Sequence, residues 1–212
     1  MNNVSRELEA IVDDMRSDFG ARHAAREQGL ARCREALRHS ANAIRAVHRG
    51  EFPAAEELVA QASALLGQAQ AALSSHPAIF HAGFVHDAQK EYAEACLTLA
   101  IIAGRPLPTP QALGIEYNAY LNGLGETVGE LRRHLLDRLR AGDVEHCEHC
   151  LSAMDDIYSV IVTFDYPEAI TSGLRRTADA VRGILERTRG DLTIAVRQRD
   201  LERKLDEFES RL

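Results

Sequence analysis

Apolar residues recur at helical spacing along almost the whole chain, and signals for β-strands are nearly absent. In three segments the apolar residues are separated by three positions, four positions or their sum, which places them on one helical face. The residues that follow this spacing are Leu30, Cys33, Leu37, Ile44 and Val47; Leu121, Leu124, Val128, Leu131 and Leu135; and Cys147, Leu151, Met154, Tyr158 and Ile161. The pattern predicts an all-α fold.

Helix-breaking residues divide the chain into about seven helices. The clearest loop is the proline-rich stretch 104–110. Asp143 is a natural N-cap for the predicted helix that begins at residue 144. The predicted helices cover residues 4–48, 53–76, 80–103, 116–140 and 144–164, then a stretch after Pro167 that ends at Arg189, and a last helix that begins at Asp191. Because the turns are short, we expect residues 1–212 to form a single-domain antiparallel bundle of about seven helices. The charged segment 196–212 is expected to project or to pack on a partner subunit.

The composition excludes several classes of protein. Of the 212 residues, 45% are hydrophobic and 27% are charged, so the chain folds rather than staying disordered. Its longest uncharged apolar stretch, from Ala95 to Gly104, is too short to span a bilayer, and the N-terminus has no apolar secretory signal. Four cysteines without a disulfide-type spacing are typical of a reducing compartment. We therefore expect a soluble, cytoplasmic protein that does not insert into a membrane.

Basic residues form one stripe although the chain is acidic overall. The formal net charge of −7 argues against a surface that is basic all over, but nucleic acid needs only a local basic patch. Four arginines of the first predicted helix share a sector of about 60°. They are Arg34, Arg38, Arg45 and Arg49. Their guanidinium groups are placed to follow a phosphate backbone. The alternative is an ordinary solvated helix face, with Glu27 and Glu35 nearby.

The third predicted helix carries three carboxylates on one stripe. Asp87, Glu91 and Glu94 stand at positions i, i+4 and i+7, where a polar helix end passes into an apolar half. Like charges in such a place repel one another unless a cation neutralises them, and oxygen ligands suit Mg²⁺ or Mn²⁺. The alternative is a solvated acidic face with Lys90 and His86 as counter-charges.

Two further acidic pairs are able to complete such a site. Asp155 and Asp156 stand inside an otherwise apolar helix, so we expect at least one of them to point inward. Glu126 and Glu130 are spaced i, i+4 on the preceding predicted helix. A buried acid is costly without a partner, so the inward Asp either binds a metal or pairs with an arginine at position 132 or 133.

The run His146-Cys147-Glu-His149-Cys150 raises the question of a zinc site. A single Cys-x-x-Cys lacks its second half, since Cys33 and Cys96 are isolated in the sequence, and Cys147 falls on the apolar seam. The run therefore favours core cysteines and surface histidines over zinc or redox chemistry.

Three stretches of the chain resemble the translin family. They are Phe164 to Leu192, which begins Phe-Asp-Tyr-Pro-Glu-Ala-Ile-Thr-Ser-Gly-Leu-Arg-Arg; Tyr120 to Arg133, which contains Gly-Glu-Leu-Arg; and Cys33 to Gly50, which ends Ile-Arg-Ala-Val-His-Arg-Gly. The similarity covers nearly the whole chain in order. It implies an all-helical, translin-like bundle that assembles into a hollow octamer and binds short RNA or single-stranded DNA.

The same resemblance implies a catalytic site. In this family the translin-associated factor X branch is a Mg²⁺-dependent endoribonuclease, with a Glu-x-x-Glu on the third helix and an Asp in a later helix. Here the run Gln89-Lys-Glu91-Tyr-Ala-Glu94-Ala95 matches the first motif, and Asp156 matches the later Asp. The resemblance thus implies that Glu91, Glu94 and Asp156 hold Mg²⁺, with Mn²⁺ as the other metal of this kind, and are the catalytic residues.

The resulting hypothesis is a homo-oligomer, expected to be an octamer, that encloses short RNA and cleaves it. Six side chains are expected to hold the nucleic-acid backbone: Arg34, Arg38, Arg45, Arg49, His86 and Lys90. The first alternative is a non-catalytic binder of RNA or single-stranded DNA, in which the acids are structural. The second is a metal-dependent phosphohydrolase that acts on a small nucleotide.

Overall fold

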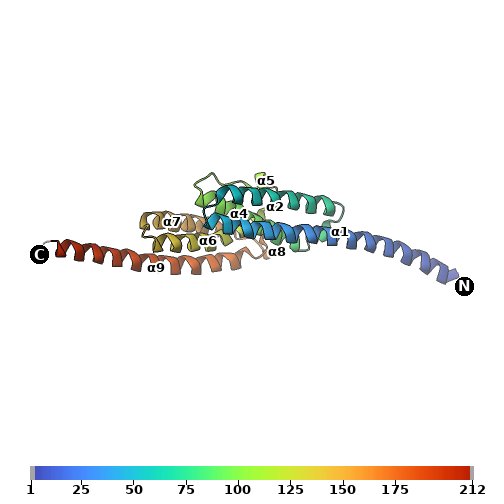
Figure 1. Ribbon diagram of the computed structural model, residues 1–212. Helices are drawn as coiled ribbons and strands as arrows, with labels where there is room; N and C mark the ends of the chain where they lie inside the picture. The colour runs from blue at the N-terminus through green and yellow to red at the C-terminus, as the bar shows by residue number, and fades with distance from the viewer. Residues whose placement is uncertain (1–2, 211–212) are drawn as a thin grey trace.

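In a computed structural model that describes residues 3–210, every regular element is a helix (Figure 1). The long helices in this range are α1 (Asn3–His48), α2 (Phe52–Leu73), α4 (Phe84–Ile102), α6 (Tyr117–Arg140), α7 (Val144–Ile161) and α9 (Leu174–Glu209). Single-turn helices in the same range are α3 (Pro77–Phe80), α5 (Pro110–Leu113) and α8 (Glu168–Thr171). The predicted all-α fold is confirmed.

Several predicted helix boundaries are confirmed by local geometry. The first helix ends at His48, and Gly50 then adopts a φ of +75°, which glycine reaches without steric cost. The side chain of Asp143 caps α7 by accepting a hydrogen bond of 3.2 Å from the backbone N–H of His146. The predicted third helix begins four residues later than expected, because Gly83, at a φ of +97°, separates α4 from the short α3.

The expected break at Gly190 is wrong, and α9 continues through it to Glu209. A single glycine costs a helix about 1 kcal/mol relative to alanine, which tertiary packing easily offsets. Here Leu185 and Leu192 are both buried on the same side of α9. Asp191, predicted to be an N-cap, instead accepts a hydrogen bond of 2.7 Å from Arg132 of α6.

One hydrophobic core joins the six long helices of the described region, and each contributes a nearly inaccessible side chain. These are, in chain order, Cys33, Leu73, Leu97, Leu131, Met154 and Leu192. Helix α4 packs against α1 and α2 on one side and against α6 on the other, and α6 in turn packs against α7 and α9. The helices α4 and α6 therefore lie at the centre of the bundle.

Helices α4 and α6 approach closely at Gly123. A Cβ atom at this position would lie 2.6 Å from the backbone oxygen of Lys90 and 2.7 Å from the Cβ of Ala93. Only a residue without a side chain fits such a contact. Glu126 follows Gly123 by three residues, so the close approach brings its carboxylate beside the acidic stripe of α4.

The contact at Gly123 predicts opposite effects for two matched glycine substitutions in α6. Gly123→Ala should lower the free energy of unfolding by about 1–3 kcal/mol, since the new methyl group overpacks the helix interface. Gly129→Ala should raise it by up to about 1 kcal/mol, because no atom lies within 4 Å of the added carbon and alanine favours the helix. Urea denaturation of both variants measures the difference. Equal effects would contradict the close packing of α4 on α6.

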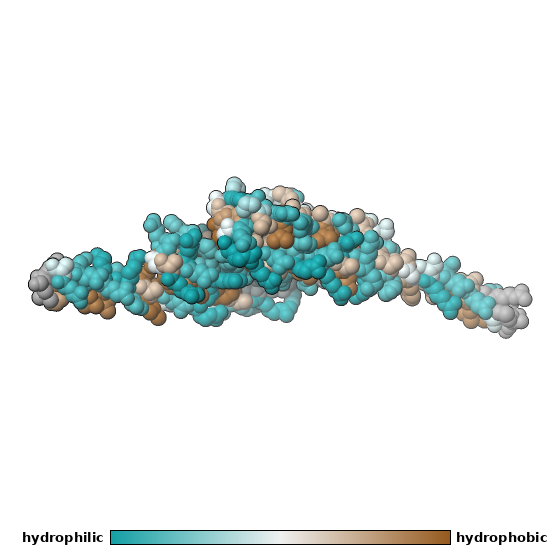
Figure 2. Space-filling model, viewed as in Figure 1, coloured by the Kyte–Doolittle hydropathy of each residue, from teal (hydrophilic) through white to brown (hydrophobic). Residues whose placement is uncertain are grey.

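The first turns of α1 and the last turns of α9 project from the bundle at opposite ends of the molecule (Figure 1). The N-terminal arm of α1 exposes large apolar side chains, namely Val4, Leu8, Ile11, Val12, Met15 and Phe19. The C-terminal arm of α9 exposes Ile194, Leu201, Leu205 and Phe208. Figure 2 shows apolar colour along both arms. Within residues 3–210, no helix combines the length and apolar character that crossing a membrane requires.

Candidate functional site

Three carboxylates from two helices converge at the centre of the bundle. Glu91 and Glu94 project from α4, and Glu126 projects from α6. One oxygen of each lies within 4.8 Å of the others. We call these three residues the acidic cluster. It lines a cavity of about 580 Å³ whose remaining walls come from α6 and the first three turns of α9.

Burial makes negative charge costly in the acidic cluster. Glu94 is only 8% exposed. Burial, and next the charge of Glu91, raises the pKa of Glu94 to about 8. The pKa of Glu91 is also raised, first by burial and then by the charge of Glu126. At neutral pH the cluster therefore holds a proton, unless a cation takes its place.

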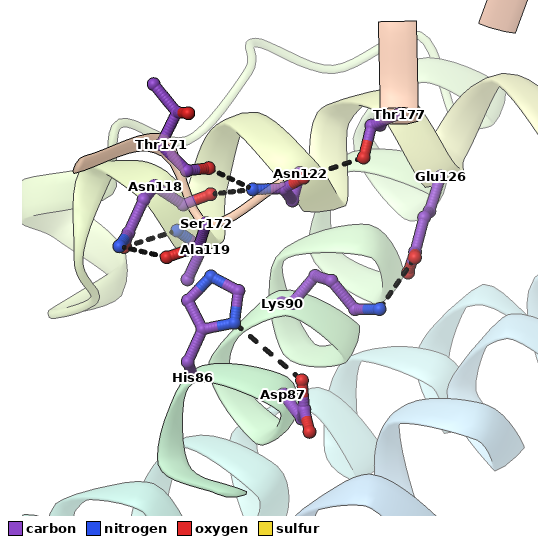
Figure 3. Close-up of polar contacts among 10 residues, drawn as sticks. All are labelled: His86, Asp87, Lys90, Asn118, Ala119, Asn122, Glu126, Thr171, Ser172 and Thr177. Carbon is purple, nitrogen blue, oxygen red and sulfur yellow. Dashed lines mark hydrogen bonds and ion pairs between the residues drawn. The ribbon is translucent and has the colours of Figure 1, made fainter. Parts of the chain in front are cut away.

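Lys90 supplies a positive charge at one edge of the acidic cluster. Its Nζ donates a hydrogen bond of 2.6 Å to Glu126 (Figure 3). Burial alone would lower the pKa of Lys90, but the hydrogen bond and charge of Glu126, together with the charges of Glu91 and Asp87, outweigh it, so that the pKa is raised. Among residues 3–210, no ion pair joins Glu91 or Glu94 to a basic side chain, so part of the negative charge stays uncompensated.

Glu130 lies one turn beyond Glu126 but has partners of its own. Its carboxylate contacts Nε2 of His48, and Arg133 lies 3.8 Å away. The hydrogen bond from His48 is the main reason that the pKa of Glu130 is lowered. Glu130 is therefore a paired carboxylate beside the acidic cluster rather than a member of it.

Asn122 anchors the beginning of α9 against α6. Its Nδ2 donates hydrogen bonds of 2.8 Å to the backbone oxygen of Asn118 and 2.9 Å to that of Thr171 (Figure 3). Its Oδ1 accepts a hydrogen bond of 2.7 Å from the hydroxyl of Thr177. Thr177 and its neighbour Arg176 line the same cavity as the acidic cluster. The network thus fixes the start of α9, which carries Arg176, beside the cavity.

The structure places Asp156 outside the acidic cluster, and its role as a metal ligand stays a prediction. Asp156 is exposed on α7 and is absent from the acidic cluster. Its neighbour Asp155 is partly buried, and both of its carboxylate oxygens lie 2.7 Å from Arg189. The third converging carboxylate belongs instead to Glu126.

The predicted nucleic-acid ligands lie in two places. The four arginines of the stripe are all exposed: Arg34, Arg38 and Arg45 lie on α1, and Arg49 follows its last residue. Arg49 also pairs with Glu51 at 2.5 Å. His86 is largely buried, and its Nε2 has no hydrogen-bond partner within the described part of the chain. Lys90 faces the acidic cluster, where it pairs with Glu126.

The sequence indicated Glu126 as one of the acids able to complete the site, although the predicted ligands were Glu91, Glu94 and Asp156. It gave no indication of Arg176. The signal for Glu126 was the small residue Gly123, which stands one helical turn before it and permits the close approach of α4. Arg176 had no such signal, because its place at the cavity depends on how α9 packs on α6.

Comparisons with known proteins agree with this fold. No protein-family model matches the chain. AfC3PO in its complex with duplex RNA is 34% identical, with a TM-score of 0.81, over 89% of this chain and 97% of that one. A crystal structure of AfC3PO gives 33% identity and a TM-score of 0.82, over 89% of this chain and 98% of that one.

Two more distant matches extend this comparison. Apo-NeC3PO shares the fold, with a TM-score of 0.78 at 18% identity, over 87% of this chain and 96% of that one. The uncharacterized protein MJ0175 of Methanocaldococcus jannaschii is 29% identical over 187 residues, which are 86% of this chain and 81% of that protein. Since AfC3PO is a translin-family protein and matches almost from end to end, the chain belongs to the translin family.

Proposed function

We propose that this protein binds RNA and cleaves it with a divalent cation, Mg²⁺ or Mn²⁺, held by Glu91, Glu94 and Glu126. The observation that carries the proposal is the convergence of these three carboxylates at a cavity, with oxygens within 4.8 Å of one another. Carboxylate oxygens are the ligands that both cations prefer in proteins.

The residues present fit such a cation. Glu94 is buried and its pKa is raised to about 8, so its carboxylate favours a proton when nothing else neutralises it. A divalent cation would replace that proton and offset the repulsion among the three acids. When bound, the cation supplies a Lewis acid that polarises a phosphoryl oxygen and makes water more acidic.

The neighbouring side chains have distinct roles in this proposal. Lys90 holds the carboxylate of Glu126 in place by the 2.6 Å hydrogen bond. Arg176, which lines the cavity, contacts an RNA phosphate there in exchange for its exposed partner Glu168. The four exposed arginines of the stripe along and just after α1 hold the RNA backbone farther along.

RNA is supported as the ligand by the relative that matches almost the full chain. AfC3PO has been determined in a complex with duplex RNA. Binding of short single-stranded RNA or DNA stays a prediction of the sequence analysis.

The ion pair between Lys90 and Glu126 favours a second candidate function, in which the protein binds RNA without cleaving it. In that case the acids are structural, and Lys90 already compensates one of them. Incubation of a labelled RNA with the purified protein, in Mg²⁺ and in EDTA, separates the two functions. Cleavage in Mg²⁺ alone supports the nuclease, while salt-dependent binding without cleavage in either buffer supports the binder.

We further propose that the chain acts as a homo-oligomer, an octamer that encloses the RNA. The exposed apolar residues of the N-terminal arm are spaced as in a coiled coil: Val4, Leu8, Ile11 and Met15. A single copy leaves this stripe in water, whereas a partner helix would bury it.

The stripe predicts that one charge on the N-terminal arm weakens the assembly. Met15→Glu should lower the mass in solution, because Met15 is 54% exposed within the stripe and a carboxylate there would be buried by a partner. Ser17→Glu adds the same charge on the opposite face and should leave the mass unchanged. Light scattering coupled to gel filtration measures both. An unchanged mass for Met15→Glu would contradict assembly through this stripe.

A further inference from the structure

A second group of metal-ligand side chains lies between α6 and α7, apart from the acidic cluster. It consists of His134 of α6 and of His146 and Cys150 of α7. One ligand atom of each lies within 4.8 Å of the others, and the two imidazole Nε2 atoms are 3.1 Å apart. Cys150 is buried, whereas both imidazoles are partly accessible, which leaves a path for an ion to enter.

The fold places these three side chains on facing helical surfaces. His146 and Cys150 stand one turn apart on α7, in the i, i+4 relation that presents two side chains on one face. The Asp143 cap fixes the first turn of α7, where His146 lies. His134 shares a face of α6 with Glu130 and Glu126, at successive steps of four residues.

We propose that His134, His146 and Cys150 form a zinc site. Imidazole nitrogen and thiolate sulfur are ligands that Zn²⁺ prefers and that Mg²⁺ does not. Zinc bonds of about 2.0–2.3 Å in a tetrahedron place ligand atoms about 3.3–3.6 Å apart. The Nε2 separation of 3.1 Å is close to that spacing, so small side-chain rotations are enough to close the site. Three protein ligands leave the fourth position to water.

The neighbouring cysteine and histidine of the same run are not ligands. The thiol of Cys147 donates to the backbone oxygens of Leu135 and Asp143, at 3.3 Å and 3.1 Å, and is fully buried. His149 is exposed and does not belong to the group of converging ligand atoms. The core position expected for Cys147 is therefore confirmed, while the site draws its third ligand from α6.

In the absence of metal the two imidazoles share one hydrogen bond between their Nε2 atoms. The zinc site has no residue in common with the acidic cluster and does not rest on the proposed nuclease. The chain then carries one oxygen site for a hard cation and one nitrogen–sulfur site for a softer one.

Cobalt spectroscopy on the full-length, tag-free, reduced and metal-free protein tests the proposal. Co²⁺ substitutes for Zn²⁺ and gives an intense thiolate-to-cobalt charge-transfer band only when sulfur is bound. We expect this band in the unaltered chain, its loss on addition of Zn²⁺, and its absence in Cys150→Ser. Equilibrium dialysis should find zinc bound to this site once per chain.

Matched variants separate this site from others that bind zinc. Cys147→Ser and His149→Gln lie in the same run and should keep the band. Glu94→Gln alters only the acidic cluster and should also keep it. His134→Gln and His146→Gln keep the thiol and should weaken cobalt binding at least tenfold, which tests the proposal even where Cys150→Ser fails to fold. Absence of the band in the unaltered chain, or its persistence in Cys150→Ser, would overturn the zinc site.

Discussion

Glu94→Gln is expected to abolish metal-dependent RNA cleavage while RNA binding survives. The substitution keeps the size of the side chain but removes its charge from the most buried position of the acidic cluster. An amide is a weaker ligand for Mg²⁺, and it carries no negative charge to neutralise a bound cation. The loss in cleavage rate should be at least about 10²-fold, the scale of losing one electrostatic contact to a transition state.

The measurement is the initial rate of cleavage of a labelled short RNA at several Mg²⁺ concentrations, next to fluorescence anisotropy of the same RNA in EDTA. Binding should change little, because the exposed arginines of α1 are untouched. Asp87→Asn is the matched control, since it removes a carboxylate that is 68% exposed on the same helix. A variant that cleaves at the rate of the unaltered chain would show that Glu94 holds no catalytic metal.

The same substitution is expected to stabilise the metal-free protein at high pH. The pKa of Glu94 in the folded chain is about 8, above its ordinary value of 4.5, because burial opposes the charged form. Between pH 4.5 and pH 8 the folded chain keeps a proton on Glu94 that the unfolded chain releases. The free energy of unfolding therefore falls as the pH rises. The free energy of unfolding falls by about 1.4 kcal/mol for each pH unit in this range, a total loss on the order of 4 kcal/mol by pH 8.

Urea denaturation in EDTA at pH 5 and at pH 8 measures this effect. Glutamine does not titrate, so Glu94→Gln should be near the unaltered chain at pH 5 and more stable than it at pH 8. Mg²⁺ should reduce this difference in the free energy of unfolding at pH 8. It binds the folded state of the unaltered chain, but it does not bind the unfolded state or the site that lacks Glu94. Parallel stability curves for the two proteins would mean that Glu94 is not buried with other acids.

The helices could be predicted from the sequence because each presents a regular apolar face to the core. Gly190 shows the limit of that reasoning. Its local preference is to end a helix, but Leu185 and Leu192 are buried on either side of it, and their packing decides the outcome. The break at Gly83 was not predicted, because the apolar pattern gives no indication of a single residue with positive φ.

The acidic cluster could be predicted only in part. Glu91 and Glu94 are near in sequence and share a helix face, so their proximity follows from helical geometry. Glu126 joins them through the close approach of α6 at Gly123, which depends on tertiary packing. Asp156 lies outside the cluster for a reason that is visible in the sequence. It follows the buried Met154 by two residues, about 200° around α7, and therefore faces outward.

The group of His134, His146 and Cys150 could likewise be predicted only in part. The spacing of His146 and Cys150 is visible in the sequence, but it indicated core and surface positions rather than a site. The third member, His134, lies on the preceding helix, and only the antiparallel packing of α6 on α7 brings it to the other two.

The most direct test of the acidic cluster compares Glu126→Gln with Asp156→Asn in the Mg²⁺-dependent cleavage assay. Both replace one carboxylate by its amide, and the two residues lie on neighbouring helices. Glu126 belongs to the cluster and Asp156 is exposed outside it, so we expect cleavage to be lost in Glu126→Gln and kept in Asp156→Asn. Cleavage that is kept in Glu126→Gln and lost in Asp156→Asn would contradict the site described here.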